Sequence, residues 1–180
     1  MSWGWLIIFG LILVVVGTTA WGAWRAAPYL PMPSRDVDRL LRLAELKTKD
    51  LMIDLGAGDG RLIITAVKNY PVTAIGYEIA LVPFLIAWWR LRYRRLRSRA
   101  KIRYQDFFSA DLSRASVVTC FLTPRAMKKL GPIISRQLSS GTAVLSYAFP
   151  IPGWTPTRID KPSQTEISIY RYDLPACLPT

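Results

Sequence analysis

The residues best suited to chemistry lie in one short segment, DLGAGDG (residues 54–60), which follows the apolar run LMI and precedes RLIITAVKNY. Gly56, Gly58 and Gly60 alternate along it, with Ala57 between the first two. Glycine has no Cβ and tolerates a positive φ, so such a turn lets a ligand lie directly against the backbone. A helix that begins here also offers unpaired N–H groups. The segment therefore predicts a ligand-binding turn between a strand and a helix.

The acidic residues near this turn indicate which ligand it binds. Turns that hold the pyrophosphate of a dinucleotide use G-x-G-x-x-G, whereas these glycines alternate and Asp54 stands two residues before the first. A carboxylate at that place would repel a phosphate, which disfavours an NAD-dependent enzyme. It would attract a cation, and S-adenosylmethionine (AdoMet) carries an ammonium and a sulfonium but no phosphate. Glu78 ends the next strand-like run, where it can accept both ribose hydroxyls. Asp106 and Phe107 end the third, where they can hold and stack on an adenine.

These residues require a sheet that brings successive strand ends together. Strand-like runs occupy residues 50–55, 72–78, 101–105, 115–122, 141–149, 155–159 and 163–173. The run at 155–159 is expected to pair with the run at 163–173. Helical patterns occupy residues 35–46, 60–70, 81–96 and 124–138, with Ser34 and Asp59 as caps of the first two and a kink at Gly131-Pro132 in the last. Strands that alternate with helices form a parallel sheet covered on both faces. We therefore predict an α/β, doubly wound, Rossmann-like sheet whose ligand lies at the carboxyl ends of the strands.

The N-terminus carries a long apolar segment. Residues 2–24 contain no charged residue, and a helix needs roughly 20 apolar residues to cross a bilayer. The pattern favours one transmembrane helix over a buried core helix, and the lack of a basic start argues against a signal peptide. We expect an anchor at 1–24, a Pro-rich connector at 25–33, a catalytic domain at 34–174 and a tail at 175–180. Because Arg25, Arg35, Arg39 and Arg42 follow the anchor, the domain is expected on the cytoplasmic side of a single-pass membrane protein.

Charge and composition narrow the partners. The net charge is +12, and the run that begins at Arg90 and ends at Arg103 (residues 90–103) holds eight basic residues and no acid. This run is a solvated helix face, a patch for anionic lipid headgroups or an RNA-binding surface; tethering favours lipid, and no base-reading element supports nucleic acid. Histidine is absent, which removes imidazole as a general base or metal ligand, so no metal is expected. Cys120 and Cys177 do not suggest a disulfide framework.

Four segments together resemble a known family. DLGAGDGRLIITAVK, AIGYE, QDFF and FPIPGWTP, in this order, are similar to the class I, seven-stranded AdoMet-dependent methyltransferases, and most similar to the FAM173 group of protein-lysine methyltransferases. The resemblance runs from about residue 28 to residue 173. Eukaryotic members of that group modify two membrane proteins, the adenine nucleotide translocase and the ATP synthase c-subunit. The resemblance thus implies a membrane-anchored enzyme that N-methylates a lysine of a protein, and a membrane-embedded protein is a candidate substrate.

The same resemblance assigns roles to residues of this chain. Asp54, Gly56, Gly58 and Gly60 would line the methionine and ribose part of the cofactor, Glu78 would bind the ribose, and Asp106 with Phe107 the adenine. The Pro-rich segment PYLPMPS would lie over the active site. Two segments depart from the family pattern: Glu78 is followed by Ile79-Ala80-Leu81 instead of Asn-Pro, and the fourth strand is followed by FLTP with the single Met127 instead of FGVP and two methionines.

The substrate side is less specified by the sequence. Tyr29, Phe149 and Trp154 are candidates for an aromatic wall around a lysine, with core packing as the alternative. Thr123-Pro124 either faces the substrate or caps a helix. Asp54, Asp59 or water are the candidates for the base. The alternative functions are a small-molecule or lipid methyltransferase and a catalytically inactive, membrane-tethered scaffold; an RNA methyltransferase ranks lower because FLTP lacks a planar polar group.

Overall fold

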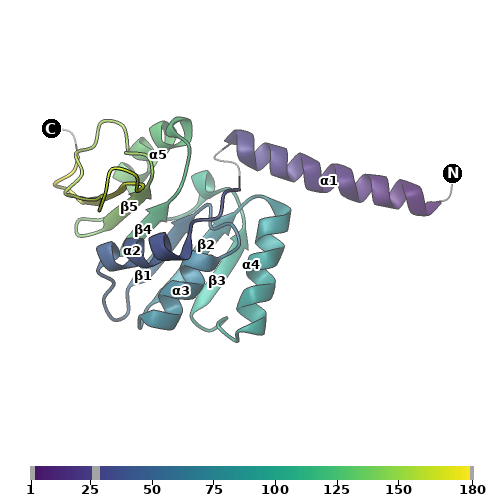
Figure 1. Cartoon of the computed structure of the whole chain (residues 1–180), viewed down its shortest axis with the longest axis horizontal. Helices are drawn as coiled ribbons and strands as arrows, with labels where there is room; N and C mark the ends of the chain where they lie inside the picture. Colours follow the sequence, from purple (N-terminus) through teal and green to yellow (C-terminus); the bar gives the residue numbers. More distant parts are fainter. Residues whose placement is uncertain (1–2, 26–28, 179–180) are drawn as a thin grey trace.

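The computed structural model describes residues 3–25 and 29–178, with only the backbone of residues 19 and 21–25. Parts of the expected anchor, connector and tail (residues 1–2, 26–28 and 179–180) lie outside the described residues. The rest forms an α/β body from which one helix extends (Figure 1).

Within the described residues, seven strands form one sheet in the order β3-β2-β1-β4-β5-β7-β6. The first five are parallel, and β7 runs antiparallel to both β5 and β6. Their bounds are Leu51–Leu55 (β1), Thr73–Glu78 (β2), Ala100–Tyr104 (β3), Val117–Cys120 (β4), Ala143–Tyr147 (β5), Arg158–Asp160 (β6) and Ile169–Asp173 (β7). The sheet confirms the predicted Rossmann-like fold, including the pairing of the last two strands.

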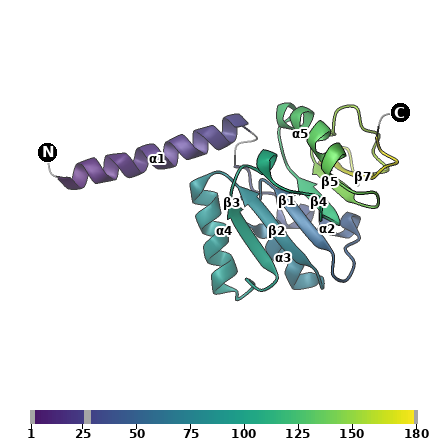
Figure 2. The same cartoon turned by 180° about the vertical axis from the view of Figure 1, so that it is seen from behind.

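Helices cover both faces of this sheet (Figures 1 and 2). On one face lie α2 (Ser34–Ala44), α3 (Arg61–Asn69) and α4 (Leu81–Tyr93), and on the other lie α5 (Pro124–Gln137) and the 3₁₀ turn η1 (Phe107–Ser109). Side chains of each strand alternate between the faces, so Met52 packs under α3 while Ile53 packs under α5. The α5 helix continues through Pro132, where the sequence predicted a kink.

Two predicted helix caps are wrong. The cap of α2 is Pro33, and Ser34 is the first helical residue without a capping hydrogen bond from its side chain. The cap of α3 is Gly60 in the left-handed conformation, while the carboxylate of Asp59, one residue earlier, accepts from the N–H of Arg61 at 3.2 Å and pairs with the side chains of Arg61 and Arg90.

The chain order places a switch point between β1 and β4. From β1 the chain winds outward through β2 to β3, and then returns to the other side of β1 as β4. The loops after these two neighbouring strands leave the sheet edge in opposite directions, so a crevice opens at their carboxyl ends. The segment DLGAGDG follows β1 at this crevice.

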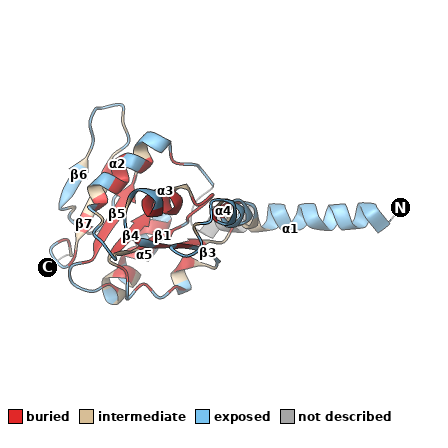
Figure 3. Cartoon of the chain, turned by 90° about the horizontal axis from the view of Figure 1, so that it is seen from below, coloured by how far each residue is buried: buried red, intermediate tan, exposed pale blue. Residues whose placement is uncertain are grey.

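The N-terminal helix α1 (Trp3–Arg25) contacts α4 and otherwise extends away from the body (Figures 1 and 3). Its described side chains are nearly all exposed, as Figure 3 shows by their pale colour. Among the helices whose side chains the structure describes, none has the length and apolar character required to cross a membrane. The transmembrane helix expected at 1–24 is therefore not found there.

Candidate active site

The glycine turn after β1 is held against β2 by its backbone. Gly56, Gly58 and Gly60 have φ values of 81°, 54° and 75°, a region that side chains disfavour. The N–H groups of Gly56 and Ala57 both donate to the carbonyl of Tyr77, at 3.0 and 2.9 Å. These bonds fix the turn at the carboxyl end of β2, where the next acidic residue stands.

Glu78 binds the turn through its carboxylate. One oxygen accepts from the N–H of Gly58 at 2.8 Å, and the other accepts from those of Ile79 and Ala80 at 2.9 and 2.7 Å. Burial raises the pKa of Glu78, while the three N–H donors act in the opposite direction. The carboxylate is thus placed beside the glycine turn, where the sequence analysis expected a ribose.

A cavity opens between the turn, β4 and the Pro-rich segment. Its walls come from the glycine turn, the ends of β2 and β4, η1 and residues 29–32. The lining comprises Tyr29, Leu30, Pro31, Met32, Leu40, Asp54, Gly56, Ala57, Gly58, Asp59, Arg61, Leu62, Glu78, Ile79, Ala80, Phe107, Cys120, Phe121 and Leu122. The cavity is therefore largely apolar, with three carboxylates grouped on the side of the turn.

Two of these carboxylates differ in their protonation. Asp54 is fully buried and accepts from the Thr119 hydroxyl at 2.8 Å; burial, followed by the nearby charges of Glu78 and Asp59, raises its pKa to about 7. Burial would also raise the pKa of Asp59, but hydrogen bonds from Arg61 and Arg90 outweigh it and lower that pKa to about 2. Asp59 is therefore a permanent anion, and Asp54 can change its protonation near neutral pH.

Arg61 connects Asp59 to residues 29–32, which form the roof of the cavity. Its guanidinium donates to both carboxylate oxygens of Asp59, at 2.9 and 2.8 Å, and to the carbonyl of Met32 at 2.6 Å. A Cβ on Gly58 would lie 3.0 Å from the ring of Tyr29, so that ring rests on the turn. Burial, followed by the charge of Asp59, raises the pKa of Tyr29. The roof, residues 29–32, is thus fixed to the glycine turn.

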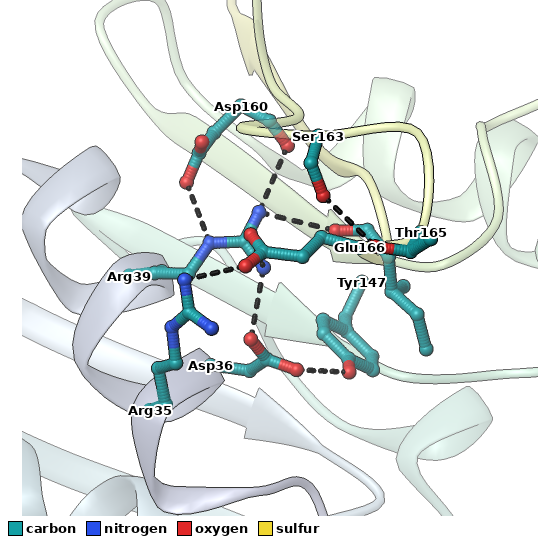
Figure 4. A network of polar contacts seen from close by, with 9 residues as sticks. Arg35, Asp36, Arg39, Tyr147, Asp160, Ser163, Thr165 and Glu166 are labelled. Carbon is teal, nitrogen blue, oxygen red and sulfur yellow. Dashed lines mark hydrogen bonds and ion pairs between the residues drawn. The ribbon is translucent and has the colours of Figure 1, made fainter.

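A second polar network holds α2 against the β6–β7 end of the sheet (Figure 4). Arg39, only 4% exposed, pairs with Asp36 at 2.8 Å, with Asp160 at 3.2 Å and with Glu166 at 3.7 Å. The other oxygen of Asp36 accepts from the hydroxyl of Tyr147 at 2.6 Å. The Tyr147 ring in turn packs edge-on against Phe121, with centroids 4.8 Å apart. Since Phe121 lines the cavity, the network connects the β6–β7 end of the sheet to the site.

Most predicted cofactor residues reach the cavity. Asp54, Gly56, Ala57, Gly58, Glu78 and Phe107 line it. Gly60 does not, because it packs against α4: a Cβ there would lie 3.0 Å from that of Ala87. Asp106 lies beside a neighbouring hollow with Ile79, Tyr104 and residues 17–18 of α1, and its carboxylate accepts from the N–H of Phe108 at 3.0 Å.

Of the residues predicted to contact substrate, only Tyr29 lines the cavity. Thr123 is the cap of α5, accepting from the N–H of Ala126, and Pro124 is its first residue. Trp154 packs on Tyr172 in the core beneath α5, with centroids 5.8 Å apart. Phe149 is partly exposed and is absent from the lining.

Sequence reasoning missed several residues of the site. Phe121 and Leu122 carry no polar signal, and Arg61 lies next to the motif without a predicted role. Gly76 in β2 is the least visible: a Cβ there would lie 2.6 Å from that of Ala57, so only glycine allows the turn to approach β2. Within the described residues, no cluster of acidic or cysteine side chains is arranged to hold a metal ion.

Known proteins are similar to this chain in sequence. A profile described as the ANTKMT methyltransferase domain matches residues 54–158. The chain is 39% identical over 135 residues to a protein-lysine N-methyltransferase of Saccharolobus islandicus strain REY15A, covering 74% of this chain and 84% of that protein. It is 33% identical over 189 residues to the lysine N-methyltransferase of the ATP synthase c-subunit from Rattus norvegicus, covering 98% of this chain and 83% of that protein.

A solved structure agrees with the sequence matches. The crystal structure of an RNA methyltransferase from Salinibacter ruber in complex with S-adenosyl-L-homocysteine has a TM-score of 0.78 and 35% identity, and the match covers 83% of this chain and 97% of that one. The profile spans more than half of this chain, and its match begins at Asp54, the first residue of the glycine-turn segment. The chain therefore belongs to the ANTKMT methyltransferase family and is an AdoMet-dependent methyltransferase.

Proposed function

We propose that the protein N-methylates a lysine side chain of another protein. The observation that carries this proposal is the similarity, over 74% and 98% of this chain, to two proteins named for lysine N-methylation. The relatives named for the ATP synthase c-subunit and for the adenine nucleotide translocase suggest a membrane protein as the substrate. The cavity is compatible with this, because an apolar wall suits the methylene stem of a lysine.

The residues around the glycine turn fit AdoMet. The left-handed glycines leave the backbone open, the partly charged Asp54 suits the ammonium group, and Glu78 suits the ribose hydroxyls. When bound, AdoMet supplies an activated methyl group, so the protein has to position the acceptor and keep water away. The apolar roof and the strand-end residues Phe121 and Leu122 would do both, because they supply apolar walls of the cavity.

The acceptor amine must be neutral before it can react. A free lysine has a pKa of about 10.4, and a largely apolar cavity favours the neutral form through desolvation. Asp59 does not serve as the base, because its pKa of about 2 leaves it unable to hold a proton at neutral pH. Of the two acids considered, Asp54 can hold one, since its pKa lies at about 7.

RNA is the second candidate substrate. It is favoured by the name of the Salinibacter ruber structure and by the basic run of residues 90–103. Against it, β4 is followed by Phe121-Leu122-Thr123-Pro124, which offers no planar polar group for a base nitrogen. Methylation of a small molecule or a lipid, and a catalytically inactive scaffold, are the remaining candidate functions. Attachment to a membrane, with the catalytic domain on its cytoplasmic side, is a separate proposal that rests on the uncharged residues 2–24 and on the arginines that follow them.

One experiment separates these functions. The full chain is incubated with AdoMet carrying a radioactive methyl group and with membrane proteins, total RNA or lipid extract from the same cells. We expect label in protein, on lysine by mass spectrometry, and none with a Glu78→Ala variant. Label in RNA alone or in lipid alone would identify that fraction as the substrate and refute the proposal. No label in any fraction would support the catalytically inactive scaffold.

A further inference from the structure

Helix α4 carries apolar side chains on two faces. Pro83, Ala87 and Leu91 recur every four residues and are buried against the body. The outer face bears a second apolar stripe at helical spacing, made of Val82, Leu85, Ile86, Trp89 and Tyr93, all exposed. A helix that is apolar all round is usually covered on both sides. Among the residues that the structure describes, none buries this outer stripe of α4.

The exposure of this stripe is large. Trp89 is 59% exposed and Tyr93 is 74% exposed, and their rings stack with centroids 5.2 Å apart. Trp88 flanks them and is exposed as well. These values include the contact between α4 and α1, so the N-terminal helix leaves the stripe open. A contiguous apolar patch of this kind marks a surface that binds a protein or a membrane.

The end of the stripe runs into positive charge. Between Glu78 and Asp106 the chain has no acidic residue, and residues 90–103 hold eight basic ones. Arg90 is paired with Asp59, but among the described residues no ion pair involves Arg92, Arg94, Arg95 or Arg97, all of them exposed. The surface thus passes from aliphatic side chains, through Trp89 and Tyr93, to unpaired arginines.

This order of side chains matches the boundary of a membrane. Tryptophan and tyrosine favour the interface between hydrocarbon and water, and arginine is attracted to anionic headgroups. A second copy of the chain would bring two positive surfaces together. RNA would use the arginines but would leave Val82, Leu85 and Ile86 in water. We propose that the outer face of α4, with the arginines that follow it, binds the surface of an anionic lipid bilayer and seats the domain on it without spanning it.

Vesicle binding by the full chain tests the charged part of the surface. Wild type is expected to bind vesicles of phosphatidylcholine with 30% phosphatidylglycerol more tightly than vesicles of phosphatidylcholine alone. The double substitution Arg92→Glu and Arg97→Glu should weaken binding to the anionic vesicles by about 30-fold or more, since each basic residue near such a surface contributes several-fold. The matched control, Lys128→Glu with Lys129→Glu, changes the net charge equally on exposed positions of α5 and should retain binding.

A fluorescent label tests the position of the stripe. Both native cysteines are buried, so a Tyr93→Cys variant can be labelled selectively with an environment-sensitive dye. Its emission should shift to the blue with anionic vesicles, and that of a labelled Lys128→Cys variant should not. Trp89→Ala with Leu85→Ala should weaken vesicle binding, whereas Ile159→Ala with Ile167→Ala, exposed on the β6–β7 side, should not.

Three results would overturn the proposal. The first is an equal loss of vesicle binding in the α4 and α5 charge variants, which would show that vesicle binding depends on net charge alone. The second is the same dye shift at both labelled positions or at neither. The third is a loss of affinity for single-stranded RNA in the α4 variants with unchanged vesicle binding, which would assign the surface to RNA. Binding of S-adenosyl-L-homocysteine, measured in parallel, verifies that each variant is folded and is independent of the lipid result.

Discussion

The approach of the glycine turn to β2 yields a sharp prediction, because it depends on a single missing methyl group. A Cβ on Gly76 would lie 2.6 Å from the Cβ of Ala57, 3.0 Å from Cδ1 of Ile102 and 3.2 Å from Cδ1 of Ile63. Carbon atoms in contact are about 3.5–4.0 Å apart. The isoleucines can change rotamer, but the methyl group of Ala57 cannot move without its backbone. That backbone is held by a hydrogen bond from the N–H of Ala57 to the carbonyl of Tyr77, at 2.9 Å. In a Gly76→Ala variant the turn must therefore move away from β2 by about 1 Å.

The expected size of the effect follows from this geometry. An extra methyl group in a packed core costs about 1–3 kcal/mol, and the upper half of that range applies because backbone has to move. Displacing binding groups by about 1 Å can cost roughly 100-fold in function, so we expect binding of S-adenosyl-L-homocysteine to weaken by at least about 10-fold. An Ala57→Gly variant alone should lose only about 1 kcal/mol.

The double variant decides whether the clash is the cause. With Ala57→Gly present, the 2.6 Å contact disappears and only the two adjustable isoleucine contacts remain. The losses of the single variants should then fail to add, with a coupling of at least about 1 kcal/mol, and ligand affinity should recover in part. Urea unfolding and calorimetric titration with S-adenosyl-L-homocysteine measure the two quantities. Losses that add to within about 0.5 kcal/mol would refute the reasoning, since independent sites behave in that way.

Three further predictions concern charged groups. Glu78→Gln should weaken binding of S-adenosyl-L-homocysteine by at least about 10-fold in calorimetric titration, because charge-assisted hydrogen bonds contribute about 1.5–3 kcal/mol. The control Asp111→Asn, at an exposed position, should have no effect. An unchanged affinity of the Glu78→Gln variant would show that Glu78 does not bind the ligand. The pKa of Asp54 is raised to about 7, so the folded protein holds a proton that the unfolded chain releases near pH 4. The free energy of unfolding should therefore fall by up to about 4 kcal/mol between pH 4 and pH 7 and then level off. The Asp54→Asn variant should lack this component when both proteins are unfolded with urea at each pH. Parallel pH profiles would contradict it. Arg39→Met removes a buried guanidinium from three partly buried carboxylates and should lower the free energy of unfolding by about 2–3 kcal/mol, whereas the exposed Arg35→Met should change it by less than about 0.5 kcal/mol. Equal effects in urea unfolding would show that the network of Figure 4 does not stabilise α2.

The cofactor side of the site was predictable because it is local. Asp54, the glycines and Glu78 each lie directly at a strand end, and parallel strands bring those ends to one edge. Hydrophobic periodicity located the bounds of the first five strands to within two residues, so the position of each acid in the sheet followed. The last strand begins at Ile169, later than the predicted residue 163. Glu78 accordingly lies beside the glycine turn, where its carboxylate accepts from the N–H of Gly58, and its role toward a ribose stays a prediction.

The roof and the substrate side were not predictable in this way, because they depend on contacts between distant segments. Asp59 looks like a helix cap in the sequence, but α4 brings Arg90 to it from 31 residues away. Trp154 follows a strand as an active-site aromatic would, yet it fills space beside Gly131 and Tyr172. Gly76 resembles any glycine in a strand, and only its distance from Ala57 reveals its role.

Helix α4 connects the cofactor turn with the surface that we assign to lipid. Its inner side packs Ala87 against Gly60, and its Arg90 pairs with Asp59 in the turn. Its outer side carries Trp89 one residue away from that arginine. Because one helix makes both sets of contacts, a bilayer bound to its outer side would be held in a fixed position relative to the glycine turn. A lysine that emerges near the membrane surface would then meet the roof of the cavity at a fixed distance, which a free domain with the same site could not provide.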